Sequence, residues 1–416
     1  MPRVLLLLPT TGYRSEAFVQ AAIRMGVDVT AASEKPNALA RMNPSGLLTL
    51  DFKNPQVAAQ QAVEFSKSYP IDAVVPVDSK VVAVGAAIGE ALGLRHNSVD
   101  SANAAQDKRD MRQRFDQAGV PSPRFWIGSL HEDPLALASR VEFPCVVKPL
   151  ALAASQGVIR ADDTGQFVLA VDRLAAILKR EYRHLRADDD ASSRSAGQFL
   201  IETFVEGPEF ALEGMLSRGE LHVLALFDKP DPLDGPFFEE TIYVTPSRLA
   251  ARRQTEIADC AAIAARSLGL TEGPIHAELR LTSDGPSVIE VNPRSIGGLC
   301  SRMLRFGTGC SLEELIIRHA LEGGFELPQR QSPAVGVMMI PTPQSGRLAE
   351  TLGLESARAV SGIEEITISA HPGQRLVPLP EGAQYLGFIF ARAESPAAVE
   401  SALRESHAQL NFVITE

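Results

Sequence analysis

The sequence predicts a multidomain protein of mixed α/β and α+β class, and three observations support this prediction. The chain has 416 residues, more than one compact core holds, which suggests two to four domains. Short apolar runs alternate with helical patterns up to about residue 100, whereas a later pair of strands flanks a tight turn. A polar junction bounded by prolines, Leu327-Pro328 to Pro333, precedes a final stretch of short strands.

The N-terminal region predicts an open parallel sheet. Val4 to Leu8 is a short apolar run, and a glycine-containing loop and a helical pattern that ends at Gly26 follow it. The same order recurs, with strands at Val27 to Ala31 and Ala73 to Val77 and helices at Gln56 to Ser68 and Val81 to Leu92. Because strands that alternate with helices form parallel sheets covered on both faces, we expect an α/β domain over residues 1–103.

The remaining chain predicts two further domains. A charged helix from Gln106 to Gly119 is broken by Val120-Pro121-Ser122-Pro123, and a mixed α and β region follows. We expect this central domain to cover residues 104–330 and a small α+β domain to cover residues 331–416.

Composition restricts the partners. The formal net charge is −11, from 40 basic and 51 acidic residues, which argues against binding nucleic acid or an anionic membrane surface. The longest apolar run near the start is far below the ~20 residues of a membrane span and lacks a cleavage pattern. We therefore expect a cytoplasmic protein that acts on small molecules, with no nucleic acid and no membrane as partner, and a homodimer is compatible with this prediction.

The most informative pattern is a predicted hairpin with an Asp-Gly turn. If the hairpin is centred on Asp284, Glu278 faces Glu290 and His276 faces Asn292, and all four side chains share one face.

Carboxylates that oppose each other across a ladder have Cβ atoms ~5 Å apart and repel unless a proton or a cation lies between them. Glu278, Glu290 and Asn292 offer oxygen ligands and no thiolate, a set that favours magnesium over zinc. The alternative is an exposed hairpin whose solvated glutamates align by coincidence.

Further motifs recur in a fixed order around this hairpin. They are Lys108 with Gly119-Val120-Pro121-Ser122-Pro123, then Lys148-Pro149, then Glu202 to Glu209, then His276 with Glu278, then Glu290 with Asn292 and Arg294. Together these segments resemble the ATP-grasp superfamily. The resemblance implies an ATP-grasp fold with an N-terminal open parallel-sheet domain and a small C-terminal α+β domain similar to that of biotin carboxylase.

The resemblance also implies roles for individual residues. The residues implied for ATP are Lys108 and Lys148 for the α- and β-phosphates, Ser155, Gln156 and Gly157 in the phosphate loop, Glu202 and the Val205 backbone for adenine, and Glu209 for ribose. Glu278, Glu290 and Asn292 would bind two Mg²⁺ ions, for which Mn²⁺ can substitute. Arg294 would face the reacting acyl phosphate, with Asn292 and Lys148 as the other implied catalytic residues.

One segment departs from the family pattern. The loop after Lys148 is usually rich in glycine and serine, so that backbone N–H groups can surround a phosphate. Here it reads Leu-Ala-Leu-Ala-Ala-Ser-Gln-Gly-Val from Leu150 to Val158. Only Ser155, Gln156 and Gly157 fit the family pattern.

The segment from Phe227 to Ser247 resembles the substrate segment of the L-amino acid ligases. The implied substrate residues are Lys229, Glu240, Tyr243, His276, Arg294, Gly297 and Gly298. Tyr243 replaces the usual histidine of a Glu-x-x-His pattern, and a strand residue with no ligand role is its alternative interpretation. Gly298 lies where some relatives carry a bulky side chain, which suggests a larger first substrate.

Three functions remain open at this point. The first is an ATP-dependent carboxylate–amine ligase that forms an amide or peptide bond through an acyl phosphate and releases ADP and phosphate. The second is a carboxylase-type enzyme that makes carboxyphosphate from bicarbonate, and the third is an inactive nucleotide-binding regulatory protein. The intact lysine and metal motifs argue against the third, and the 227–247 segment favours the first over the second.

Overall fold

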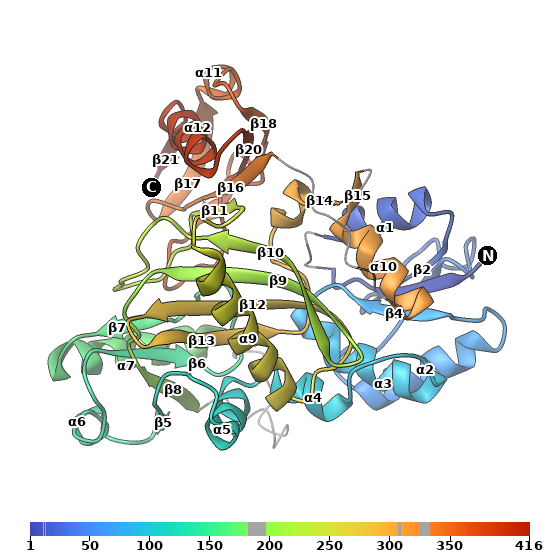
Figure 1. Cartoon of the computed structure of the whole chain (residues 1–416), viewed down its shortest axis with the longest axis horizontal. Helices are drawn as coiled ribbons and strands as arrows, with labels where there is room; N and C mark the ends of the chain where they lie inside the picture. Colours follow the sequence, from blue (N-terminus) through green and yellow to red (C-terminus); the bar gives the residue numbers. More distant parts are fainter. Residues whose placement is uncertain (11, 13, 182–196, 307–308, 325, 327–332) are drawn as a thin grey trace.

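A computed structural model describes residues 1–10, 12, 14–181, 197–306, 309–324, 326 and 333–416. The described chain forms three regions around a central sheet (Figure 1). Most of the predicted junction from Leu327 to Pro333, with the boundary at 330/331, lies outside the described residues. In the part of the chain that the structure describes, no helix has both the length and the apolar character needed to cross a membrane.

The N-terminal region is the predicted parallel sheet. Its strands lie in the order β3-β2-β1-β4, with β1 at Arg3–Leu7, β2 at Asp28–Ser33, β3 at Leu47–Thr49 and β4 at Ala73–Pro76. Its helices are α1 (Ser15–Arg24), α2 (Pro55–Ser66), the short η1 (Ser79–Val81), α3 (Val82–Leu92) and α4 (Val99–Ala104). Leu5 and Leu7 face α2 and α3, whereas Val4 and Leu6 face α1, so both faces of β1 are buried.

A smaller antiparallel sheet carries the Lys148 and Glu202 motifs of the central region. It has the order β5-β8-β6-β7, with β5 at Phe125–Ser129, β6 at Cys145–Pro149, β7 at Ile159–Ala161 and β8 at Gln198–Thr203. The helices that belong to this part are α5 (Lys108–Ala118), α6 (Pro134–Ala138) and α7 (Thr164–Glu181). The side chain of Asp107 caps α5 by accepting from the backbone N–H groups of Arg109 and Asp110, which fixes Lys108 at its first turn.

The large sheet has eight strands among the described residues, in the order β13-β12-β9-β10-β11-β16-β20-β18. The strands from the central region are β9 (Glu209–Ser217), β10 (Glu220–Asp228), β11 (Ile242–Thr245), β12 (Gly273–Thr282) and β13 (Gly285–Asn292). Helix α9 (Ala251–Ser267) covers one face of these strands (Figure 1). Ile275, Ala277 and Leu279 of β12 pack under α9, so the alternate residues of β12 occupy the opposite face.

The C-terminal region continues this large sheet through the pairing of β11 with β16. Its strands are β16 (Ala334–Ile340), β17 (Gly346–Leu352), β18 (Ile363–Ile368), β19 (Arg375–Leu376), β20 (Gly387–Ala393) and β21 (Asn411–Thr415). Its helices are α11 (Leu354–Arg358) and α12 (Pro396–Ala408). The last region is thus α+β, as predicted, and shares its backbone hydrogen bonding with the central region.

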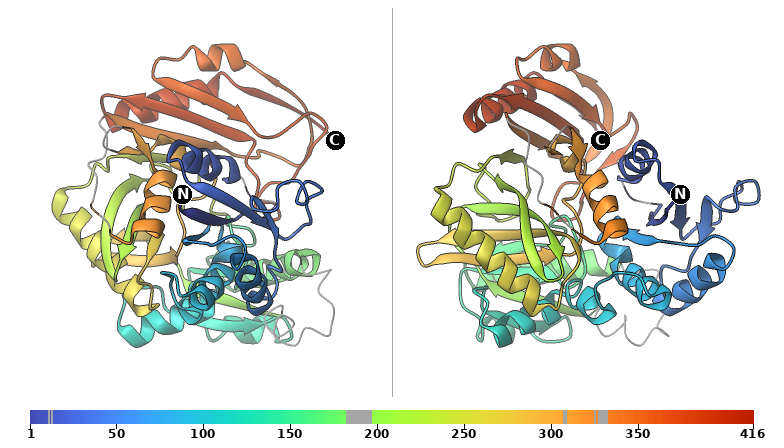
Figure 2. Two further views of the ribbon diagram at one scale, coloured as in Figure 1. Left: turned by 90° about the vertical axis from the view of Figure 1, so that its right-hand side faces the viewer. Right: turned by 45° about the vertical axis from the view of Figure 1, so that its right-hand side comes forward.

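The segment after β13 joins the N-terminal region to the rest. It contains the short η2 (Cys300–Met303), β14 (Arg305–Phe306), β15 (Cys310–Ser311) and α10 (Leu312–Glu322). Figure 2 shows α10 beside the N-terminal region, where it contacts α1 and β4. Arg24 of α1 donates to Glu314 of α10 at 2.8 Å. The N-terminal sheet is therefore fixed against the segment that follows the hairpin.

Candidate active site

The hairpin of β12 and β13 has the predicted pairing and an unpredicted turn. Glu278 pairs with Glu290 and His276 with Asn292, as the sequence predicted. The turn, however, pairs Thr282 with Gly285, so the hairpin is not centred on Asp284. A β-bulge beyond Glu278 shifts the register by one residue and restores the predicted pairs.

The bulge also explains the burial on β13. Val288 and Val291 both belong to the core under α9, although they lie three positions apart along the strand. Strict alternation would place them on opposite faces. Because the extra residue is absorbed between them, Glu290 and Asn292 both remain on the polar face.

Nucleotide-motif residues hold the Glu290 half of this face. Lys108 Nζ lies 3.7 Å from Glu290 Oε2, and Asn292 Nδ2 donates to Glu290 Oε1. Burial alone would raise the pKa of Glu290, but Lys108, the Asn292 hydrogen bond and the charge of Arg294 outweigh it and lower the pKa to about 2. Glu290 is therefore ionised at neutral pH.

A buried network holds the Glu278 half. His276 Nδ1 lies 2.6 Å from Glu213 Oε1, and His276 Nε2 lies 3.2 Å from Glu278 Oε1. Burial would lower the pKa of His276, but its hydrogen bonds to Glu213 and Glu278 raise it to about 9. Burial would also raise the pKa of Glu278, and Lys229 and His276 reverse this shift. His276 is thus a protonated imidazolium beside the carboxylates of Glu213 and Glu278.

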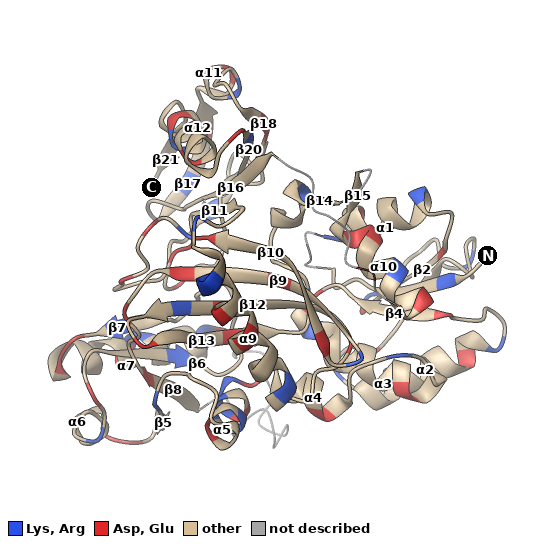
Figure 3. Cartoon of the chain, viewed as in Figure 1, with Lys and Arg blue, Asp and Glu red and all other residues tan. Residues whose placement is uncertain are grey.

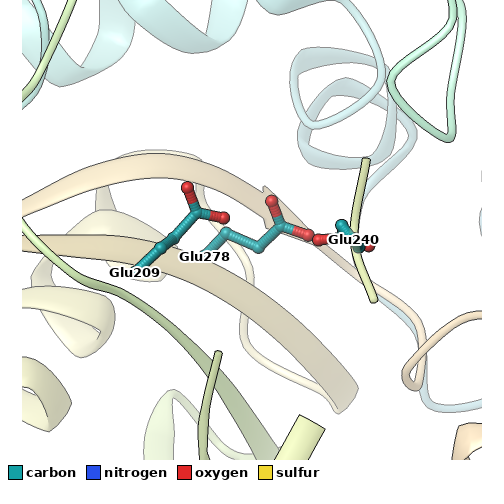
Figure 4. Close-up of side chains that lie close together, drawn as sticks. All are labelled: Glu209, Glu240 and Glu278. Carbon is teal, nitrogen blue, oxygen red and sulfur yellow. The ribbon is translucent and has the colours of Figure 1, made fainter. Parts of the chain in front are cut away.

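Lys229 lies between three glutamates. Its Nζ is 2.7 Å from Glu209 Oε1, donates to Glu240, and is 3.7 Å from Glu278 Oε2. Figure 4 shows the carboxylates of Glu209, Glu240 and Glu278 pointing toward one another. Burial would lower the pKa of Lys229, but these three carboxylates raise it well above its usual value.

Tyr243 belongs to the same cluster. Its hydroxyl donates to Glu240 Oε1 at 2.7 Å, and Lys229 Nζ lies 5.0 Å from its ring centroid. Burial, followed by the charge of Glu240, raises the pKa of Tyr243 well above its usual value, so the phenol stays neutral. The structure thus brings the predicted substrate residues Lys229, Glu240 and Tyr243 together.

A second buried cluster links α5 to the small sheet. Lys148 Nζ lies 2.5 Å from Glu202 Oε2, and Arg112 Nε donates to Glu202 Oε1 at 2.6 Å. Burial would raise the pKa of Glu202, but Arg112 and Lys148 lower it below its usual value. Arg112 also donates to the carbonyl of Ile289 in the hairpin at 2.5 Å. In this arrangement the Glu202 carboxylate, predicted to read adenine, anchors Lys148.

Arg280 connects the residues predicted for adenine and ribose. It donates from Nε to Glu209 Oε2 at 3.0 Å and from Nη1 to the carbonyl of Val205 at 2.8 Å. Arg280 and Glu278 lie two positions apart on β12 and so share its polar face. Glu209, predicted to bind ribose, therefore holds two buried cations, Lys229 and Arg280.

The segment after β13 meets the N-terminal region. Arg294 Nε donates to Ser79 Oγ at 2.8 Å. The buried Arg14 donates from Nη1 to the carbonyl and hydroxyl oxygens of Ser295, both at 2.9 Å, and to the carbonyl of Ile296. Burial, with a contribution from Arg294, lowers the pKa of Arg14 to about 10. The predicted catalytic Arg294 thus lies against a wall from the N-terminal region.

The two predicted pocket glycines have different surroundings. A Cβ on Gly297 would contact nothing within 4 Å, whereas a Cβ on Gly298 would lie 2.9 Å from the ring of Phe388. Gly298 also has φ +57°, a left-handed conformation that favours glycine. The space beside Gly298 is therefore filled by an aromatic residue of β20.

Sequence and structure comparisons agree with this geometry. Residues 141–303 match the model of the ATP-grasp domain, and residues 338–415 match that of the L-amino acid ligase C-terminal domain 2. The crystal structure of an L-amino acid ligase from Bacillus licheniformis superposes with a TM-score of 0.82 and 25% identity, over 100% of this chain and 99% of that one. The chain thus has an ATP-grasp fold and is similar to an L-amino acid ligase over its whole length.

Two curated relatives illustrate its place among the ATP-grasp proteins. Alanine–anticapsin ligase of Bacillus subtilis is 29% identical over 252 residues, 59% of this chain and 53% of that protein. Dapdiamide A synthase of Enterobacter agglomerans is 25% identical over 352 residues, 81% of this chain and 78% of that protein. The chain spans about half the length of the alanine–anticapsin ligases that it matches.

The ATP-grasp site has donors that fit magnesium. Glu278 and Glu290 are directly paired on one face of the hairpin, and Asn292 lies two residues along on the same face. Carboxylate and amide oxygens are ligands that Mg²⁺ accepts. Lys108 and Lys148 place positive charge beside this face, since both contribute to lowering the pKa of Glu290.

Several ATP-grasp site residues were not predicted. Arg280 and Glu213 could have been predicted, because each lies an even number of positions from a predicted residue and so shares its face of the strand. Arg280 is two positions from Glu278 on β12, and Glu213 is four positions from Glu209 on β9. Arg112 follows Lys108 by one helical turn on α5. Arg14 and Ser79 had no local signal, since more than 200 residues separate them from their partners.

Proposed function

We propose that this chain is an ATP-dependent ligase that joins a carboxylate to an amine through an acyl phosphate. The observation that carries the proposal is the paired Glu278 and Glu290, with nucleotide-side cations at one end and the Lys229 cluster at the other. Figure 3 shows charged residues along the strands of the central sheet as well as on the outer helices. This arrangement suits the transfer of a phosphoryl group toward an amino-acid-like substrate.

The residues near Glu290 fit the phosphoryl donor. Lys148 is positioned by Glu202, and Lys108 is held by the carbonyl of Leu152 at 2.9 Å. Magnesium held by Glu278, Glu290 and Asn292 would neutralise phosphate charge during in-line transfer. Such transfer depends mostly on positioning and charge stabilisation.

The residues near Arg294 fit the carboxylate that receives the phosphoryl group. A carboxylate is already a nucleophile at neutral pH, so the first step needs no general base. Arg294, oriented by Ser79, supplies a fixed positive charge for the acyl phosphate that forms. Glu240 supplies a negative charge for the ammonium group of an amino-acid-like substrate.

Hydroxylamine trapping tests the proposal. We expect hydroxamate and ADP to accumulate when the full chain, MgATP and the correct acid are incubated without an amine, and EDTA to abolish both products. The acid is found by screening amino and organic acids for ADP release. Strict bicarbonate dependence without hydroxamate would favour the carboxylase function instead. Small molecules are the only partners that this function requires, and the homodimer stays a prediction.

A further inference from the structure

The phosphate loop from Leu150 to Val158 has an unusual backbone for its composition. Ala154, Ser155 and Gly157 have φ values of 54°, 55° and 73°, all in the left-handed region. Only the last of these is glycine. Non-glycine residues are strained in that region, so the surrounding structure must hold the loop.

The loop is held by a turn of the C-terminal region. The backbone N–H of Gly157 donates to the carbonyl of Pro380 at 2.9 Å. The side chain of Gln156 donates to the carbonyl of Glu381 at 2.9 Å. These contacts join residues more than 220 positions apart. They bind the C-terminal turn to the phosphate loop, which has a single glycine.

The same turn is fixed to helix α7 on the other side. Arg173 donates to both carboxylate oxygens of Glu381, at 2.5 and 2.9 Å, and Arg180 donates to the Glu381 carbonyl. Helix α7 also supports the loop, because a Cβ on Gly157 would lie 3.0 Å from Leu174. Glu381 is therefore the point at which the loop, α7 and the C-terminal region meet.

We propose that Glu381 is a positioning residue that holds the phosphate loop ready for ATP. Contacts from the C-terminal turn replace the conformational freedom that additional glycines give the loop in related proteins. If the loop has several conformations and only one of them binds the nucleotide, a contact that stabilises this conformation increases the fraction of molecules that can bind. The apparent nucleotide affinity rises by the same factor. The inference rests on the proposed function only in assigning the ligand of the loop.

The test compares four full-length proteins: the unmodified chain, Glu381→Gln, Arg173→Glu, and the double variant with Glu381→Arg and Arg173→Glu. Amide hydrogen exchange of residues 150–158 and the Kd for MgADP are measured without any acid or amine. We expect both single variants to exchange about two- to fivefold faster at Gly157 and to bind MgADP about two- to fivefold more weakly. The double variant restores the ion pair with reversed charge and should return both values to those of the unmodified chain.

Glu364→Gln is the matched control, because Glu364 pairs with Arg392 in the same C-terminal region, away from the loop. It should change neither measurement. If Glu381→Gln exchanges and binds like the unmodified chain, or if the double variant is no better than the single variants, the proposal is overturned. A chain that does not bind MgADP at all would contradict the proposed function, and the exchange comparison would still test Glu381.

Discussion

The two halves of the hairpin face hold their carboxylates in different ways. Around Glu290, the nearest cation is Lys108, whose side chain is 17% exposed and whose Nζ lies 3.7 Å from Glu290 Oε2. Around Glu278, His276 and Lys229 are only 4% and 3% exposed and belong to a network of charges. We therefore expect the first half to rearrange around a ligand more readily than the second, which the protein itself holds in place.

The strongest test of this comparison is the stability of two lysine variants. Lys229→Met leaves Glu209, Glu240 and Glu278 without their shared cation, and loss of one partner from a buried ion pair costs about 3–5 kcal/mol. Lys108→Met should cost about 1–2 kcal/mol, because its contacts are partly solvated. Urea denaturation of both variants measures the difference. Equal losses would contradict the distinction between the two halves.

The next largest effect is expected on turnover. Glu290→Gln keeps the size of the side chain and removes the charge of a proposed magnesium ligand. We expect kcat to fall about 100- to 1000-fold, the range seen when one charge-stabilising group is lost, while the melting temperature changes little. Glu220→Gln, an exposed glutamate of the same sheet, is the control. Near-normal turnover of Glu290→Gln at low millimolar Mg²⁺ would contradict the magnesium assignment.

Much of the hairpin face, in both halves, could be predicted from the sequence. Alternation fixes which side chains share a face, so Glu278, Glu290, His276 and Asn292 followed from the strand pattern alone. The predicted pairs Glu278–Glu290 and His276–Asn292 are correct, although the register next to the turn was predicted one residue off. The bulge compensates this difference. A bulge at Ile289 has no signature in a strand of alternating character and was therefore not predictable.

The network around Lys229 depended on contacts between distant segments. Lys229 and Glu240 were assigned by resemblance, and no local pattern indicated that one ammonium joins Glu209, Glu240 and Glu278. The C-terminal region illustrates the same limit. Its α+β character followed from short strands and turns, but the pairing of β16 with β11, which merges it with the large sheet, depends on tertiary packing.

A further prediction separates the Lys229 cluster from the nucleotide. Glu240→Gln keeps an oxygen to accept from Lys229 and Tyr243 but removes the charge for a substrate ammonium. A charge-assisted hydrogen bond contributes about 1.5–3 kcal/mol, so the KM of the amino-acid-like substrate should rise about 10- to 100-fold. The KM for ATP should stay within about twofold. Steady-state kinetics with each substrate varied in turn measures both values, and equal shifts would indicate a structural role.

The smallest effect is expected for Tyr243→Phe. The phenol is buried and neutral and donates one hydrogen bond to Glu240, so its loss should cost about 0.5–1.5 kcal/mol, or about two- to tenfold in the KM of the same substrate. The aromatic ring remains against Phe227, so the core should keep its packing. Tyr243→His restores the residue usual in L-amino acid ligases and should change the preference among amino acids more than it changes the KM for ATP. If Tyr243→Phe raises the KM of the amino-acid-like substrate as much as Glu240→Gln does, the hydroxyl and not the carboxylate selects the substrate. The charge assigned to Glu240 then loses its support.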